Sequence, residues 1–169
     1  MLKLQKKLKN DYGLVFNDED LLKTAFTHSS FTNEERLPKI ANNERLEFLG
    51  DVALSLVISD YLYRTYPEKL EGELSKMRSS IVRTESLANF SRSCGFGEFL
   101  RLGHGEEKMG GRSRAALLAD IFESFTGAMY LEAGLETVKT FLSNTLFTEV
   151  DSFEYFSFVD NKTILQEYV

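Results

Sequence analysis

The sequence predicts an all-α protein, and three observations favour this class. Its 169 residues include only two prolines, runs of β-branched residues are few, and apolar residues recur with the 3.6-residue period of amphipathic helices. Because 43% of the residues are hydrophobic, the chain is long enough to bury one good core. Its single cysteine, Cys94, excludes an internal disulfide and is expected to pack as a small apolar side chain.

Helices are expected in seven segments, and several have recognisable ends. Asn17 or Asp18 can cap the second helix and Thr84 the fifth, because short polar side chains accept hydrogen bonds from the first free backbone N–H groups. Gly95 and Gly134 are expected to end two others. The expected ranges are 2–11, 18–28, 38–66, 72–82, 84–94, 112–133 and 135–149.

The span 103–111 is rich in glycine and is predicted to be a flexible connection between helices. It lacks the spacing of a Walker phosphate-binding loop. The chain has no run of 18 apolar residues and no cleavable signal pattern. We therefore expect a soluble, cytoplasmic protein that does not associate with membranes.

Three carboxylates, Glu44, Glu47 and Asp51, share one face of the helix expected at 38–66, within roughly 60° of one another at 100° per residue. Asn42 or Asn43 can cap or frame this part of the helix. A solvated acidic face would continue with polar residues, but this face continues with apolar ones, and apolar residues cover most of the remaining directions. The helix is therefore predicted to be buried, and ionised groups entering a core must be neutralised, paired or bound to metal.

A second acidic pair, Asp120 and Glu123, stands three residues apart in an apolar helix that is expected to start near Ser113. Its neighbours on that face include the small residues Ala116 and Gly127, which would let another helix approach closely. The pair lies too far from the helix start to serve only as a complement to the helix dipole. The two acid-bearing helices are therefore predicted to form one site between them.

The ligand types indicate which metal this site would bind. Four or five carboxylates repel one another unless cations or protons neutralise them, and oxygen-only ligands suit Mg²⁺ or Mn²⁺. A di-iron bundle uses Glu-x-x-His, whereas the spacings here read Glu44-x-x-Glu47 and Asp120-x-x-Glu123. One cysteine and two histidines are too few for zinc, and His28 is expected to pack or to hydrogen-bond near its helix end. The pattern favours magnesium-assisted hydrolysis.

At these residues the chain resembles the ribonuclease III family. The stretch 43–51, Asn-Glu-Arg-Leu-Glu-Phe-Leu-Gly-Asp, matches the signature of that family almost letter for letter. The blocks at 26–30, 71–78 and 118–127 agree in order and spacing, so the resemblance covers nearly the whole chain. It implies an all-helical endonuclease domain, a bundle around two buried acid-bearing helices, that cuts double-stranded RNA as a homodimer.

The resemblance also implies roles for particular residues and a particular outcome of cleavage. The ends would be 5′-phosphate and 3′-hydroxyl with short 3′ overhangs, the cofactor would be Mg²⁺ with Mn²⁺ able to substitute, and the substrates would include rRNA and mRNA precursors. Whether one or two metals act on each strand stays open. The implied roles are metal binding for Glu47, Asp51, Asp120 and Glu123, catalysis for Asp51 and Glu123, support near the scissile strand for Glu44 and Glu71, and insertion into the partner subunit for Phe48.

By the same resemblance, residues 1–149 are expected to form the endonuclease domain, 150–161 a linker, and 162–169 the first residues of a truncated double-stranded-RNA-binding domain. The net charge of −6 and the pI near 5.1 are unusual for a nucleic-acid-binding protein. Basic clusters nevertheless remain, and on RNA they would read the backbone and A-form shape rather than the sequence. These clusters are Lys3, Lys6, Lys7 and Lys9; Lys76, Arg78 and Arg83; and Lys108, Arg112 and Arg114.

A non-catalytic relative that serves as a dimeric RNA-binding scaffold is the main alternative within the same fold. Such a relative would be expected to lose acids from the cluster, and this chain retains all of them. The di-iron oxidoreductase is a second alternative, which bound iron would revive. The enzyme is therefore the favoured hypothesis.

Overall fold

The computed structural model describes residues 1–150, which form ten α-helices and three short 3-10 turns without a β-strand. The all-α prediction is confirmed. The predicted linker and truncated RNA-binding domain lie almost entirely outside the described residues. The helices are α1 (Leu2–Tyr12), α2 (Glu19–Ala25), α3 (Ser29–Glu34), α4 (Glu44–Thr65), α5 (Glu71–Val82), α6 (Thr84–Ser93), α7 (His104–Lys108), α8 (Ala115–Ala133), α9 (Leu135–Asn144) and α10 (Leu146–Val150), and the turns are η1 (Lys39–Ala41), η2 (Phe96–Phe99) and η3 (Gly111–Ser113).

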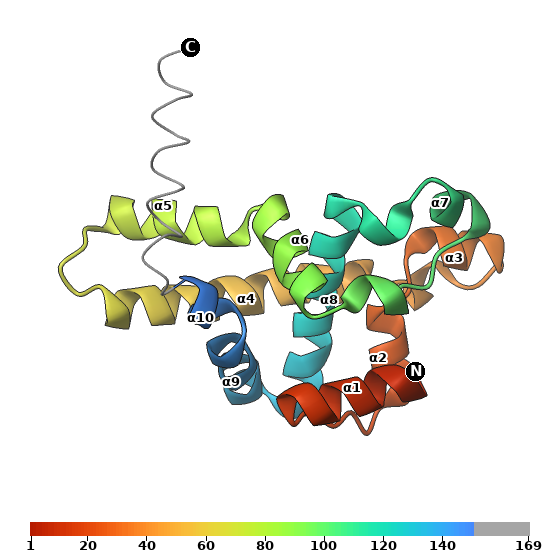
Figure 1. Cartoon of the computed structure of the whole chain (residues 1–169), viewed down its shortest axis with the longest axis horizontal. Coiled ribbons are helices and arrows are strands. Elements are labelled where there is room, and N and C mark those ends of the chain that lie inside the picture. The colour runs from red at the N-terminus through yellow and green to blue at the C-terminus, as the bar shows by residue number, and fades with distance from the viewer. Residues whose placement is uncertain (151–169) are drawn as a thin grey trace, which may run out of the picture.

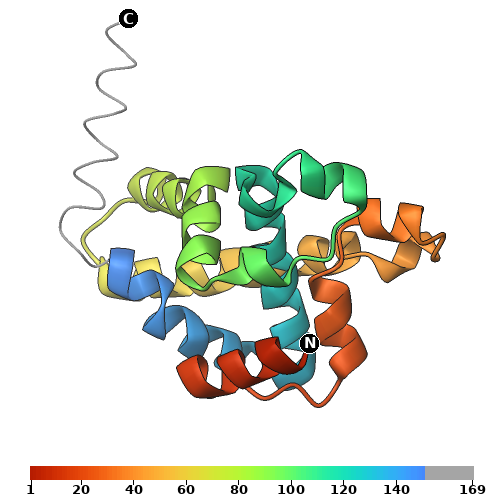
Figure 2. The same ribbon diagram turned by 45° about the vertical axis from the view of Figure 1, so that its right-hand side comes forward.

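Helix α8 passes through the middle of the molecule, with α4 crossing it and α1 lying near its C-terminal end (Figures 1 and 2). It packs most extensively against α4 and then against α6. Phe122 and Phe125 of α8 and the neighbouring Phe26 and Phe96 are fully buried. Their rings meet largely edge to face, with centroids 5.4 Å apart for Phe26 and Phe96 and 4.9 Å apart for Phe96 and Phe125. This aromatic core fixes α8 and so fixes the acids that α8 carries.

Helix α4 begins at Glu44 rather than at the expected residue 38. The preceding residues form η1, and the side chain of Asn42 accepts a hydrogen bond of 3.1 Å from the Glu44 N–H, so Asn42 frames the helix start as predicted. The expectation that α4 is buried all round is wrong for one face. Phe48, Val52 and Leu56 are 78%, 57% and 54% exposed, because α8 covers only the opposite side of α4.

The segment expected to be one helix at 18–28 is divided into α2 and α3. Between them, Thr27 pairs with Arg101 in an isolated parallel bridge, in which the Arg101 N–H donates to Phe26 O at 2.8 Å and the His28 N–H donates to Arg101 O at 3.1 Å. These long-range bonds take the backbone groups that a continuous helix would use. The ring of His28 then caps α3, accepting from the Ser30 N–H at 3.2 Å, so hydrogen bonding near a helix end is confirmed.

The other predicted helix ends are mostly confirmed. Asp18 caps α2 through the Leu21 N–H at 2.8 Å, and Gly95 and Gly134 follow α6 and α8 with positive φ angles. The prediction that Thr84 caps the fifth helix is wrong. α6 already includes Thr84, and the residue before it, Arg83, makes no side-chain capping hydrogen bond. The helix expected at 135–149 breaks at residue 145 into α9 and α10.

The glycine-rich span 103–111, predicted to be a flexible connection, includes a short helix that its composition did not indicate. It contains α7 and leads into η3, and Arg112 holds both against the chain before them. The Arg112 guanidinium pairs with Glu107 at 2.6 Å and donates to the carbonyl oxygens of Gly97 and Leu100 at 3.2 and 2.7 Å. Charge pairing therefore orders a segment that has little apolar side-chain surface to bury.

No helix among the described residues is long and apolar enough to cross a membrane.

Candidate metal centre

Helices α4 and α8 touch backbone to backbone where they cross. A β-carbon placed on Gly127 would lie 2.3 Å from the carbonyl oxygen of Leu46, and one placed on Gly50 would lie 1.8 Å from the carbonyl oxygen of Glu123. The sequence indicated the close approach at Gly127, but it missed the reciprocal role of Gly50. Both positions therefore need glycine because no other residue leaves room for the facing backbone.

Three carboxylates gather at this crossing, from Glu47 on α4 and from Asp120 and Glu123 on α8. One carboxylate oxygen of each lies within 4.8 Å of the others, and all three side chains are half-buried. The acids of α4 and α8 therefore meet in one cluster, as the helical spacing indicated.

The cluster is electrostatically costly in the absence of a cation. Burial, followed by repulsion from Asp120, Glu44 and Asp51, raises the pKa of Glu47 to about 7. Burial, followed by repulsion from Asp51, Glu47 and Asp120, raises the pKa of Glu123 to about 8. The pKa of Asp120 is also raised, by burial. Glu47 and Glu123 therefore tend to retain protons near neutral pH unless a cation replaces them.

Asp51 and Glu44 border the cluster on the more exposed side of α4. Asp51 lies close enough to raise the pKa of both Glu47 and Glu123, and Glu44 acts on Glu47. Neither belongs to the group of three oxygens that lie within 4.8 Å of one another. The site is thus a half-buried set of three acids with two further acids at its open edge.

Residues from the first part of the chain hold the cluster in place. The Asn43 N–H, just before α4, donates to Thr27 O at 2.8 Å, and the buried Ser124 hydroxyl on α8 donates to Ala25 O at 2.8 Å. His28 follows in the same segment, and its charge acts on Asp120 to lower the pKa that burial raises. The segment 25–28 therefore braces both acid-bearing helices, a role that the sequence pattern did not reveal.

Glu71 is the predicted site acid that the fold does not bring to the cluster. It begins α5, accepts a hydrogen bond of 2.7 Å from Ser75, and lines a groove of ≈ 620 Å³ between α4 and α5. The groove is also lined by Leu56 and Tyr63 of α4 and by Arg78 of α5. Within one chain, Glu71 thus belongs to a different surface.

Two of the predicted basic clusters are partly neutralised within the fold. Lys7 pairs with Asp11 at 2.6 Å, and Arg114 pairs with Glu106 at 2.6 Å. Arg112 is engaged as described above. The pairing reduces the number of cations that these clusters can offer to an anionic partner.

The donor set fits a hard divalent cation. Carboxylate oxygens are the ligands that Mg²⁺ and Mn²⁺ prefer, and neither a histidine nor a cysteine joins the three clustered acids. A cation placed among these oxygens would offset both the burial of the ionised carboxylates and the repulsion between them, which together raise the pKa values of Glu47 and Glu123. Together, an all-helical fold and a cluster of acids at a helix crossing define a class of metal-dependent hydrolase.

Comparison with known proteins identifies the family within this class. Residues 18–150 match the model of Ribonuclease-III-like domains. The chain is 78% identical to Ribonuclease 3 of Lactococcus lactis over 167 residues, covering 99% of this chain and 72% of that protein. It is 56% identical to Ribonuclease 3 of Streptococcus thermophilus, with 99% and 73% covered.

Solved structures agree. A nuclease domain of ribonuclease III from Campylobacter jejuni superposes with a TM-score of 0.79 at 37% identity, covering 88% of this chain and 97% of that one. A second structure of that domain, described as flexible in a region involved in dimer formation, gives a TM-score of 0.74 at 40% identity, with 80% and 91% covered. The chain belongs to the ribonuclease III family. It is an endoribonuclease, and therefore a hydrolase.

Proposed function

We propose that this endoribonuclease cleaves double-stranded RNA with Mg²⁺, or Mn²⁺ in its place, leaving 5′-phosphate and 3′-hydroxyl ends with short 3′ overhangs. The observation that carries the proposal is the cluster of Glu47, Asp120 and Glu123, whose carboxyl groups have raised pKa values at a helix crossing. The relatives that match nearly the whole chain are named Ribonuclease 3, which supports the choice of RNA. Processing of rRNA and mRNA in the cytoplasm belongs to the same proposal.

Under this proposal the chain's own acids divide the work. Glu47, Asp120 and Glu123 hold the cation, and Asp51, at the more exposed edge, orients the attacking water or completes a second cation position. When bound, a divalent ion supplies a lowered pKa for water and positive charge for the phosphate in the transition state. Glu44 supports the open edge of the site.

We further propose that the active form is a homodimer. Phe48, Val52 and Leu56 form an exposed apolar strip along α4 that leads into the groove beside Tyr63. A two-fold axis near the middle of this strip would pair two α4 helices so that Phe48 of each copy reaches the groove of the other. The same symmetry would carry Glu71 of the partner subunit toward this cluster. The solved Campylobacter jejuni domain described by its dimer-forming region supports an assembly of this kind.

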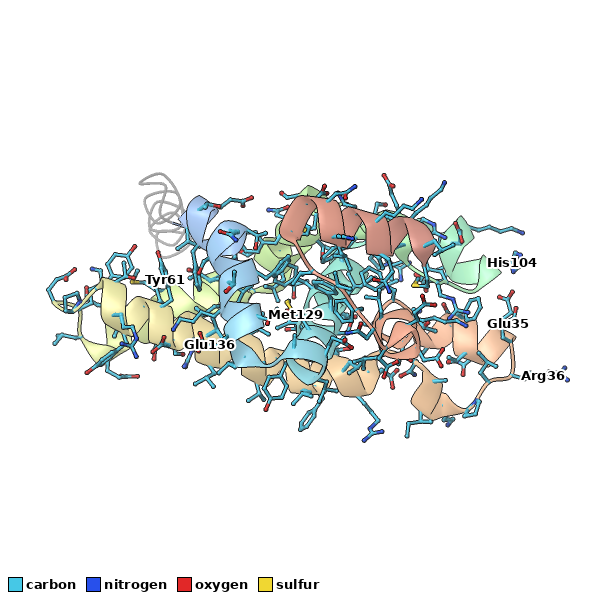
Figure 3. The ribbon with its side chains drawn as sticks, turned by 90° about the horizontal axis from the view of Figure 1, so that it is seen from below. Glu35, Arg36, Tyr61, His104, Met129 and Glu136 are labelled. Carbon is cyan, nitrogen blue, oxygen red and sulfur yellow. The ribbon has the colours of Figure 1, made fainter. Side chains whose placement is uncertain are left out.

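The decisive experiment incubates the chain with a long RNA duplex in Mg²⁺ and in EDTA, beside Glu123→Gln and a control, Glu136→Gln. Glu136, labelled in Figure 3, is an exposed acid on α9 that does not belong to the group of three clustered acids. We expect cleavage by the parent and the control only with Mg²⁺, and none by Glu123→Gln. Product ends are read by phosphatase sensitivity and by ligation.

Each other result contradicts a defined part of the proposal. Cleavage in EDTA would contradict the requirement for a metal ion. Undiminished cleavage by Glu123→Gln would contradict the role of Glu123 in the site. Duplex binding without cleavage by the parent would favour the scaffold alternative. Iron found in the purified protein by metal analysis would favour the oxidoreductase.

A further inference from the structure

The chain leaves α3 through a turn in which an arginine occupies the position that usually favours glycine. The Leu37 N–H donates to Thr32 O at 2.9 Å, and the Arg36 N–H donates to Asn33 O at 3.3 Å. This pair of bonds is the Schellman pattern of a helix C-terminus, in which the residue after the cap adopts a left-handed conformation. That residue is Arg36, with φ of 53°, the one non-glycine residue with positive φ within residues 1–150.

A left-handed arginine costs free energy that a glycine at the same position would not. Nothing within the described part of the fold compensates for this cost through the side chain. Arg36 is exposed and makes no ion pair or side-chain hydrogen bond with another described residue. Figure 3 shows its side chain pointing away from the body of the protein at one end of the molecule.

The residues after Arg36 present the same combination of charge and exposure. Lys39 is exposed and has no ion-pair partner among residues 1–150, and Leu37 and Ile40 are 42% and 62% exposed. The nearby acids interact with other residues. Glu34 pairs with His104, and Glu35 lies close enough to Arg101 to affect its pKa. The segment is therefore a projecting turn with two available cations and two apolar tips.

This turn is connected directly to the acid-bearing helix. η1 ends at residue 41, α4 begins at Glu44, and Glu47 lies in the first turn of α4. Asn42 and Asn43 between them are buried and hydrogen-bonded, so the connection is short and held in place. Under the proposed function, an RNA duplex lying across the acid cluster would extend well beyond it, and this projecting turn would stand close to its path.

We propose that the turn formed by residues 36–40 is a second contact for the duplex, in which Arg36 and Lys39 bind backbone phosphates away from the cut site. The inference rests on the proposed activity on double-stranded RNA. Leu37 and Ile40 rest on the sugar edges of the wide, shallow minor groove, a surface that A-form RNA presents irrespective of sequence. The left-handed conformation of Arg36 is retained because it directs the guanidinium outward to the phosphates.

The test depends on opposite effects of one substitution at Arg36 on the stability of the fold and on the affinity for duplex RNA. Arg36→Gly relieves the backbone cost, so we expect a higher thermal midpoint together with weaker binding of a long duplex, by about tenfold. Lys39→Gln should weaken binding without a change in midpoint. Each substitution should lower the slope of log affinity against log salt by about one. Binding is measured in a Glu123→Gln background so that the duplex stays intact, and cleavage is measured in the parent.

Lys23→Gln is the matched control. Lys23 is exposed on α2, belongs to none of the three basic clusters, and makes no ion pair among the described residues. We expect the control to change neither affinity nor salt slope. If Arg36→Gly and Lys39→Gln bind as tightly as their background, or if Lys23→Gln weakens binding equally, the inference is overturned. Failure of the proposed function can be distinguished from failure of this inference. A parent protein that neither binds nor cuts duplex RNA would contradict the proposed function and this inference together.

Discussion

Gly50 faces the carbonyl oxygen of Glu123 so closely that even a methyl group on Gly50 would overlap it, at 1.8 Å. Glu123 is also one of the three clustered carboxylates. Gly50 allows α4 and α8 to approach closely. It therefore faces the backbone of Glu123, whose side chain is a candidate metal ligand. The spacing of the cluster is a consequence of this helix contact.

Gly50→Ala should accordingly destabilise the fold by at least about 3 kcal/mol, because backbone must move to accommodate the added carbon. Urea denaturation measures the change. Gly72→Ala is the matched control, since a β-carbon on Gly72 in α5 meets nothing within 4 Å, and it should gain up to about 1 kcal/mol. Similar effects of the two substitutions would show that the close approach is not rigid.

The metal-free protein should lose stability as pH rises. The folded chain holds protons on Glu47 and Glu123, whose pKa values are about 7 and about 8, at a pH where the unfolded chain has released them. Unfolding then releases protons, so stability falls from about pH 4.5 and levels off above about pH 8. Chemical denaturation across this range in EDTA measures the trend, which should be shallower for Glu123→Gln. An equal slope in that variant would contradict the assignment.

Glu123→Gln should raise the thermal midpoint of the metal-free protein at pH 8, because it removes a charge that its neighbours repel. The same variant should lose most of the additional midpoint that Mg²⁺ or Mn²⁺ gives the parent. Glu136→Gln serves as the control and should respond to metal as the parent does. A parent midpoint that millimolar Mn²⁺ does not change would contradict cation binding at the cluster.

Phe48→Ala should weaken self-association by about thirtyfold, as expected when an anchoring aromatic residue is lost from an interface. The free energy of unfolding of the single chain should change little, because Phe48 is 78% exposed there. Sedimentation over a concentration series separates the two effects. Leu131→Ala, at an apolar position 54% exposed on α8, is the control. If both variants associate like the parent, Phe48 is not an anchor.

Arg112→Lys should destabilise the fold by about 1–3 kcal/mol, although it keeps the charge. A lysine cannot reproduce the planar set of donors that reaches Glu107 together with the carbonyl oxygens of Gly97 and Leu100. Lys108→Gln, at an exposed neighbouring cation, should be nearly neutral. Thermal unfolding measures both, and a neutral Arg112→Lys would mean that α7 and η3 hold their places without this network.

The parts of the fold that periodic patterns determine could be predicted from the sequence. The apolar helix with Asp120 and Glu123 and the acidic face of Glu47 follow directly from the helical spacing, and so does their meeting. These features were predictable because local patterning and burial agree there. The class of metal that the donor atoms indicate stays a prediction.

What could not be predicted depends on contacts between distant residues. The break after α2 arises from the Thr27–Arg101 bridge, and the order of α7 and η3 arises from Arg112. Neither leaves a periodic signal. The exposed face of α4 was misread for a related reason: an apolar strip that stays exposed on the single chain has the same composition as one that the core covers.

The bridge between Thr27 and Arg101 also bears on when the protein becomes able to act. It joins loops far apart in the chain, and the carboxylates of Glu47 and Glu123 likewise meet only when the second half of the domain folds onto the first. A growing polypeptide carries only one of the three clustered acids, Glu47, until α8 has emerged. The cluster therefore cannot assemble on a nascent chain before residue 123 has left the ribosome, itself a particle rich in paired RNA.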